Sequence, residues 1–217
     1  MRMRKLWVPM LAILLTSTMV LADSVKSDGM LPPDKVVENT AKDMFSAMNA
    51  NKSDLKQHPE KLYDLIGKIL LPNFDFDVAS RLVLGRYWHS ATPTQRKAFE
   101  DAFYKFLVHS YANGMLKGNY SERNVAVEPW RGSESDTRAM VRSKVMRENA
   151  APVEVDYAMV KTKTGWKAFD VTIEGISYVI NYRNQFGPEI EKNGLDALIK
   201  RLNSDADNAG ATKSNAK

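Results

Sequence analysis

The chain has 217 residues, no cysteine and a formal net charge of +5, with 44% hydrophobic and 26% charged residues. The lack of cysteine excludes structural disulfides and a lipid-modified N-terminal cysteine. The sequence also lacks a Lys/Arg block interleaved with aromatic residues, the pattern that would indicate nucleic-acid binding. The length suffices for one domain with a hydrophobic core of its own.

The first 22 residues have the pattern of a secretory signal peptide. Three basic residues precede an uncharged apolar run from Leu6 to Leu21, and Val20 and Ala22 are small residues at the positions that a signal peptidase reads. A membrane anchor is the alternative, but the run is shorter than the roughly 20 residues that span a bilayer. We therefore predict export, cleavage after Ala22 and a soluble mature protein.

The first half of the mature chain is predicted to be helical. After a flexible lead-in, Asp34 is expected to cap a helix, and His58-Pro59 is expected to separate it from a second helix. Pro72 is expected to end that second helix. A short helix follows from Asp75 to Gly85. The inward residues of these helices are Val37, Ala41, Met44, Met48, Leu62, Leu65, Ile66, Ile69, Leu70, Val78, Ala79, Leu82 and Val83.

A long helix is predicted to begin at Thr92, with Pro93 in its first turn and Gln95 completing a capping box. Gly114 and Gly118 are stop signals. One face carries Ala98, Phe99, Ala102, Phe103, Phe106, Leu107, Ser110, Tyr111 and Met115. Such an aromatic stripe is typical of a core-facing helix, and the alternative is that part of it lines a cavity for an apolar ligand.

Beyond Gly118 the hydrophobic period changes from helical to alternating. Alternation predicts strands at Val125–Val127, Ala139–Met146, Val153–Met159 and Phe169–Ile173, and Lys163-Thr164-Gly165 is predicted to be the tight turn of a hairpin. One apolar and one polar face indicate a sheet with helices on one side. The fold class is therefore α+β, with about four antiparallel strands.

The C-terminal part is predicted to contain two more helices. Ser177 caps the first, which Gly187-Pro188 is expected to interrupt, and residues from Ser204 to Lys217 are expected to be disordered. The inward residues are Val179, Tyr182, Phe186, Leu195, Leu198, Ile199 and Leu202. The predicted organisation is a signal peptide at 1–22, a single domain at 23–203 and a tail at 204–217.

No catalytic or metal-binding pattern is recognised. His58, His89 and His109 lack a second ligand at metal-binding spacing. The sequence around Ser177 lacks the closing glycine of a nucleophile elbow, and the acidic residues Asp170 and Glu174 fit a solvated strand face. We therefore expect neither an enzyme nor a cofactor.

Two segments, Leu71–Leu107 and Gly165–Ile190, closely resemble the MlaC family of periplasmic phospholipid carriers, also called toluene-tolerance proteins. The family's Leu-Gly-x-Tyr/Phe element is here Leu84–Tyr87, and its Thr-Pro-x-Gln-Arg helix start is Thr92–Arg96. The family's late Asp-Val/Met-x-Ile/Val-Glu-Gly-x-Ser signature is here Asp170–Ser177. The two motifs together are specific, and the resemblance covers nearly the whole mature chain.

This resemblance implies a nuclear-transport-factor-2-like cone, in which helices wrap a curved antiparallel sheet around an apolar pocket. It also implies a monomeric carrier, with phospholipid as cargo, in the pathway that maintains outer-membrane lipid asymmetry. The implied partners are an outer-membrane lipoprotein–porin complex and an inner-membrane ABC transporter with an MCE-domain subunit. The alternatives are a related module or enzyme for a smaller hydrophobic molecule, and a chaperone-like protein with an apolar groove.

A carrier of acyl tails needs a wall that is apolar and deformable. The candidate tail contacts are Val83, Leu84, Phe103, Leu107, Tyr111, Val155, Tyr157, Phe169, Val171, Ile173 and Val179, for each of which simple core packing is the alternative. The candidate adaptable methionines are Met44, Met48, Met115, Met140, Met146 and Met159. Between Lys117 and Arg147 basic residues outnumber acidic ones, which fits a docking face or a solvated strand face.

Overall fold

The computed structural model describes residues 29–58, 60–117, 124–147 and 150–211. The predicted signal peptide, Pro59, Gly118 and residues 212–217 of the predicted tail lie outside these residues. The helices are α1 (Pro33–Ala50), α2 (Lys52–Gln57), α3 (Glu60–Ile69), η1 (Leu71–Asn73), α4 (Phe76–Leu84), α5 (Tyr87–Ser90), α6 (Pro93–Lys117), α7 (Tyr178–Asn193) and α8 (Leu195–Ala211). The strands are β1 (Val125–Val127), β2 (Arg138–Arg147), β3 (Ala150–Thr162), β4 (Gly165–Ile173) and β5 (Ile176–Ser177).

The start of α6 confirms the predicted capping box. The Gln95 backbone N–H donates to the Thr92 hydroxyl over 3.2 Å, and the Thr92 N–H donates to the Gln95 side-chain oxygen over 3.0 Å. Asp75 likewise caps α4, where its carboxylate accepts from the Val78 N–H over 3.0 Å. These side chains satisfy backbone donors that a helix start leaves unpaired.

The prediction that Asp34 caps the first helix is wrong. The capping position belongs to Pro32, Pro33 occupies the first turn, and Asp34 lies inside the helix. Proline fixes its own φ near the helical value and lacks the N–H that would need a partner there. As an acidic residue in the first turn, Asp34 instead interacts favourably with the helix dipole.

The two C-terminal helices differ from the prediction. Helix α7 continues through Pro188 rather than stopping there, because Phe186 and Ile190 are buried on either side of it. Their burial offsets the cost of an interior proline, about 3 kcal/mol. Helix α8 extends beyond Asn203 to Ala211, and Ala206 in this extension is 1% exposed.

The five strands form one antiparallel sheet in the order β1-β2-β3-β4-β5. All four predicted strands are present, and the additional strand β5 has only two residues. The hairpin between β3 and β4 is confirmed, with Thr162 paired to Gly165 and the turn formed by Lys163 and Thr164. The α+β class predicted from the change of period is confirmed.

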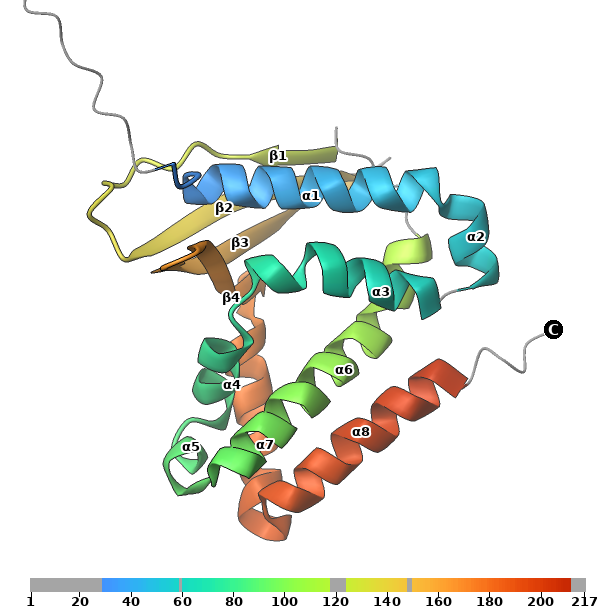
Figure 1. The fold of residues 1–217 in the computed structure, drawn as a ribbon, viewed down its shortest axis with the longest axis vertical. Coiled ribbons are helices and arrows are strands. Elements are labelled where there is room, and N and C mark those ends of the chain that lie inside the picture. Colours follow the sequence, from blue (N-terminus) through green and yellow to red (C-terminus); the bar gives the residue numbers. More distant parts are fainter. Residues whose placement is uncertain (1–28, 59, 118–123, 148–149, 212–217) are drawn as a thin grey trace, which may run out of the picture.

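Figure 1 shows two layers joined near β4. Helix α1 lies across one face of the sheet, whereas α6 and α8 run side by side in the helical layer. The segment between η1 and α4 connects the layers, because the Asp75 N–H donates to the Ala168 carbonyl of β4 over 2.7 Å. Phe74 forms an isolated parallel bridge to the same residue.

The hydrophobic residues divide between these layers. One cluster joins α4, α6, α7 and α8, and contains Phe99, Phe103 and Phe186. A second joins α1, α2, α3 and α6, and a third joins α1 to the sheet around Val141 and Trp166. Helix α1 therefore belongs to two clusters and packs against both α3 and the sheet.

Candidate binding cavity

An apolar cavity of about 270 Å³ lies between α1 and the inner face of the sheet. The ends of α3 and α6 and the segment around η1 complete its wall. The lining contains no charged residue, and its polar side chains are those of Thr40, Asn73 and Tyr157. The full lining is Val36, Val37, Thr40, Ala41, Met44, Phe45, Leu70, Asn73, Phe74, Met115, Val125, Val145, Tyr157, Met159, Ala168 and Val171.

The sheet side of the cavity follows from strand alternation. Side chains two residues apart share one face of a strand, so Tyr157 and Met159 of β3 both point toward α1. The register places Tyr157 beside Val171 of β4, and Val145 of β2 beside Val125 of β1. The sheet side of the cavity is thus formed by three valines together with Tyr157, Met159 and Ala168.

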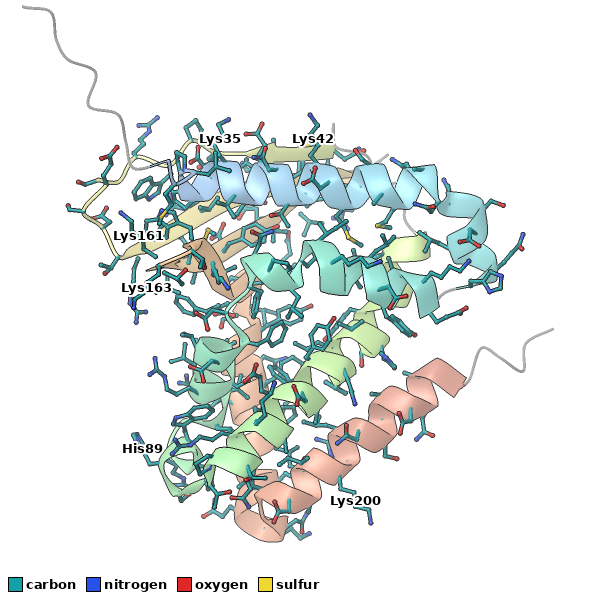
Figure 2. All side chains as sticks on the ribbon, viewed as in Figure 1. Lys35, Lys42, His89, Lys161, Lys163 and Lys200 are labelled. Atoms are coloured by element: carbon teal, nitrogen blue, oxygen red, sulfur yellow. The ribbon has the colours of Figure 1, made fainter. Side chains whose placement is uncertain are left out.

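The helical side of the cavity is formed by α1. Val36, Thr40 and Met44 are spaced four residues apart and therefore lie on one face of the helix. Thr40 and Ala41 are small, and this leaves a space above the sheet that larger side chains would fill. The opposite face of α1 carries Lys35 and Lys42, which point away from the rest of the protein in Figure 2.

The polar groups of the wall are satisfied within the protein. The Thr40 hydroxyl donates to the Val36 carbonyl over 2.7 Å, and the Asn73 amide donates to the Ile69 carbonyl over 3.0 Å. Burial raises the pKa of Tyr157, an effect that a hydrogen bond with Ser143 partly offsets. The phenol is therefore neutral at physiological pH, and the wall presents no charge to a ligand.

Of the residues predicted to contact acyl tails, Tyr157 and Val171 line this cavity. The other predicted residues lie outside its lining. Val83, Leu84, Phe103 and Val179 are buried in the helical cluster of α4, α6, α7 and α8, and Leu107 packs against the same cluster.

The remaining predicted positions are also placed by other contacts. Tyr111 is 44% exposed, and its hydroxyl shares a hydrogen bond of 2.8 Å with that of Tyr182. Phe169 lies 5.4 Å from the guanidinium of Arg138. Val155 is buried and paired with Ile173 across β3 and β4. None of these side chains belongs to the lining of the cavity.

Three of the six methionines predicted to be adaptable wall residues line the cavity, and three do not. Met44, Met115 and Met159 line the cavity, as expected for adaptable side chains at a ligand site. Met48 is buried beside α2 and α3 instead. Met140 and Met146 are 50% and 45% exposed on the opposite face of the sheet.

Sequence reasoning missed most of the α1 wall. Val36, Thr40, Ala41 and Phe45 line the cavity, yet none was among the candidate ligand contacts. The available signal was the apolar face of α1, where small residues interrupt the larger ones. That pattern is also typical of ordinary close packing between a helix and a sheet, so it does not by itself identify a cavity.

Ser177 and His109, which lie outside the cavity, are held by structural contacts. The Ser177 hydroxyl donates to Asp170 over 2.5 Å and accepts from the Ile180 N–H over 3.1 Å, which confirms it as the cap of α7. His109 bonds to the Ala206 carbonyl over 2.7 Å and stacks on Tyr63. In the part of the chain that the structure describes, no three His, Cys, Asp or Glu side chains are grouped to hold a metal.

None of the helices in residues 29–58, 60–117, 124–147 and 150–211 combines the length and apolar character needed to cross a membrane.

Comparison with known proteins gives consistent matches. The toluene tolerance protein ttg2D of Pseudomonas putida is 31% identical over 165 residues, which are 76% of this chain and 75% of that protein. The intermembrane phospholipid transport system binding protein MlaC of Haemophilus influenzae is 26% identical over 205 residues, or 93% and 94% of the two chains.

A solved structure is also similar. A phospholipid-binding protein from Ralstonia solanacearum, in complex with a phospholipid, superposes with a TM-score of 0.73 and 29% sequence identity. The match covers 83% of this chain and 99% of that one. The sequence model of the family described as "MlaC protein" matches residues 38–204. Because this match spans most of the chain, and the relatives agree with it, the chain belongs to the MlaC family.

Proposed function

We propose that this protein is a non-enzymatic phospholipid carrier that holds acyl tails in the cavity between α1 and the sheet. The observation that carries the proposal is the lining of that cavity, which is apolar apart from three neutral polar side chains. The proposal is supported by a family relative named as a phospholipid transport binding protein and by a similar structure that contains a phospholipid.

The energetics of such a cavity fit a reversible carrier. Each CH₂ group removed from water contributes about 0.8 kcal/mol, so two covered chains of about 16 carbons gain on the order of 20 kcal/mol. The same chains lose a comparable free energy when they leave a bilayer. Transfer between membrane and protein is thus nearly balanced, and small differences in contact set its direction.

The size of the cavity implies that its walls move when lipid enters. Ligand pockets typically measure roughly 300–1,000 Å³, and this cavity, at about 270 Å³, is below that range. Met44, Met115 and Met159 have unbranched side chains that adopt alternative rotamers at low cost. We propose that these side chains repack and that the space beneath α1 widens around the tails.

The cellular role that we propose follows the MlaC family. After cleavage behind Ala22, the mature protein is a monomer in the periplasm and needs no cofactor. It shuttles phospholipid between an outer-membrane lipoprotein–porin complex and an inner-membrane ABC transporter with an MCE-domain subunit. This shuttle maintains the lipid asymmetry of the outer membrane.

Native mass spectrometry of the purified protein tests the proposal. The wild type is expected to carry phospholipid, and Val171→Glu is expected to lose it, because a carboxylate in an apolar wall costs several kcal/mol. Ile180→Glu is the control, since Ile180 is 54% exposed on α7. If folded Val171→Glu keeps its phospholipid while the control behaves as wild type, the cavity is not the site.

The small volume favours one second candidate, a binding module for a smaller hydrophobic molecule. The same spectra distinguish the two functions. A phospholipid mass supports the carrier, whereas a smaller adduct that is lost in Val171→Glu supports the module.

A further inference from the structure

The outer face of β2 exposes an unusual set of side chains. The residues that point away from α1 alternate with inward residues such as Val141 and Ser143, which are buried. Met140 and Met146 on the outer face are 50% and 45% exposed. The full outer row of the strand is Arg138, Met140, Arg142, Lys144 and Met146. Cationic and thioether side chains thus share one solvent-facing strand.

A groove of about 430 Å³ lies at one end of this row, beside the connection between β1 and β2. It is lined by Glu128, Pro129, Trp130, Arg131, Met140 and Arg142. We call it the β2 groove.

The connection that shapes the β2 groove is held by local bonds. The Glu128 N–H donates to the Arg142 carbonyl over 2.9 Å, and the Ser133 N–H donates to the Asp136 carboxylate over 2.8 Å. A Cβ at Gly132 would lie 2.1 Å from the Trp130 ring, so any larger residue there would require the ring to shift. The Trp130 ring also packs 5.5 Å from that of Trp166, centroid to centroid. The groove is therefore part of the folded domain.

Two guanidinium groups of the β2 groove have no hydrogen-bonded or ion-paired partner among the residues that the structure describes. Within the described residues, neither Arg131 nor Arg142 forms a side-chain hydrogen bond or ion pair, and Glu128 is the one acidic residue of the lining. The neighbouring cations do have partners: Lys144 lies 4.0 Å from the Glu154 carboxylate, and the Arg138 guanidinium stacks on the Phe169 ring. The lining thus presents two arginines and one glutamate beside the apolar surface of Met140 and Trp130.

Tryptophan, methionine and arginine are the residue types enriched in protein–protein interfaces, and all three are present here. Guanidinium groups bind carboxylates in a two-pronged geometry that lysine does not reproduce. We propose that the β2 groove docks an acidic segment of a partner protein. Its carboxylates pair with Arg131 and Arg142, and an apolar side chain contacts Met140 and Trp130.

An anionic bilayer surface fits the groove less well. Membrane-binding segments gather about four to eight basic residues in one cluster, whereas here Asp156 and Glu154 lie directly across the sheet from Arg142 and Lys144. A concave site with interleaved charges matches a chain of defined sequence better than a flat, uniformly charged surface. This docking proposal rests on the carrier function, because a carrier must meet the proteins that supply and receive its cargo.

Fluorescence anisotropy with a synthetic peptide of alternating glutamate and leucine tests the proposal on the full mature protein. We expect saturable binding that weakens at least tenfold in Arg131→Glu and Arg142→Glu. The wild type should bind a peptide of alternating glutamine and leucine no more tightly than the two variants bind the glutamate peptide. The double variant should instead bind a peptide of alternating lysine and leucine.

Two matched charge reversals serve as controls. Arg81→Glu on α4 and Lys200→Glu on α8 change the net charge by the same amount at exposed sites outside the groove lining, and should bind the glutamate peptide as wild type. Figure 2 shows Lys200 projecting from α8. Equal binding of the glutamine peptide, unchanged binding by the Arg131 and Arg142 variants, or binding only to phosphatidylglycerol vesicles would overturn the proposal.

The same variants separate this proposal from the carrier function. Arg131 and Arg142 are absent from the cavity lining, so their variants should retain phospholipid in native mass spectra. Retained phospholipid with unaltered peptide binding would refute the docking site alone. A wild type that carries no phospholipid but binds the peptide through these arginines would refute the carrier and leave the groove as a docking site for another function.

Discussion

Tyr157 of β3 and Val171 of β4 are direct partners in the antiparallel register, and both side chains form the floor of the cavity beneath α1. Ala41 contributes to the same cavity from the helix. The narrow space between floor and helix is therefore maintained by a small residue on the helical side.

Replacing Ala41 with tryptophan should block the cavity. An indole inserted from α1 occupies the volume that acyl tails need, and we expect retained phospholipid to fall about tenfold, equivalent to about 1.4 kcal/mol of lost affinity. Ala50→Trp at the exposed end of the same helix should have no such effect. Lipid extraction and mass spectrometry measure both variants, and equal phospholipid in the two would contradict the assignment of the cavity.

The fold was largely predictable because local signals determine it. Thr92 with Gln95, Asp75 and Ser177 mark helix starts through bonds that span only three residues. Strand alternation is equally local. The errors occurred where contacts distant in sequence outweigh local preference, as at Pro188, which the buried Phe186 and Ile190 keep inside α7.

The candidate site was less predictable, because a core residue and a cavity wall have the same sequence pattern. The aromatic stripe of α6 packs on α7, where Phe103 lies 5.2 Å from the ring of Tyr182. The cavity arises instead where Thr40 and Ala41 are too small to reach the sheet. Whether a small residue leaves a space or permits close packing depends on the opposite wall, which sequence alone does not specify.

Ser80 offers a test of how the helical layer is stabilised. Its hydroxyl is fully buried on α4 and has no hydrogen-bond partner among the described residues. A buried hydroxyl without a partner costs about 1–3 kcal/mol, so Ser80→Ala should raise the free energy of unfolding by about 1 kcal/mol, as measured by urea denaturation.

Ser143→Ala is the matched control for Ser80→Ala. The Ser143 hydroxyl is also buried but donates to the Val155 carbonyl over 2.9 Å, so its removal should lower the free energy of unfolding by about 1 kcal/mol. Opposite signs for the two substitutions are expected. A loss of stability in Ser80→Ala would show that its hydroxyl is satisfied in solution.

Alkaline pH should destabilise the protein through Tyr182. Burial, followed by the 2.8 Å hydrogen bond to Tyr111, raises the pKa of Tyr182 above its usual value near 10. The folded protein therefore keeps this proton at a pH where the unfolded chain releases it. The resulting stabilisation is present in full below pH 10 and is lost as the pH rises above it, by about 1.4 kcal/mol per pH unit for one such group.

Urea unfolding at a series of alkaline pH values measures this loss. Burial also raises the pKa of Tyr157 and Tyr178, so the wild type should lose stability above pH 10 more steeply than one tyrosine explains. Tyr182→Phe removes one titrating group, and its slope should be shallower by about 1.4 kcal/mol per pH unit. Its stability at neutral pH should be lower, because Tyr111 loses its partner. Identical slopes for the two proteins would mean that Tyr182 ionises without unfolding, and that α6 and α7 separate there to admit water.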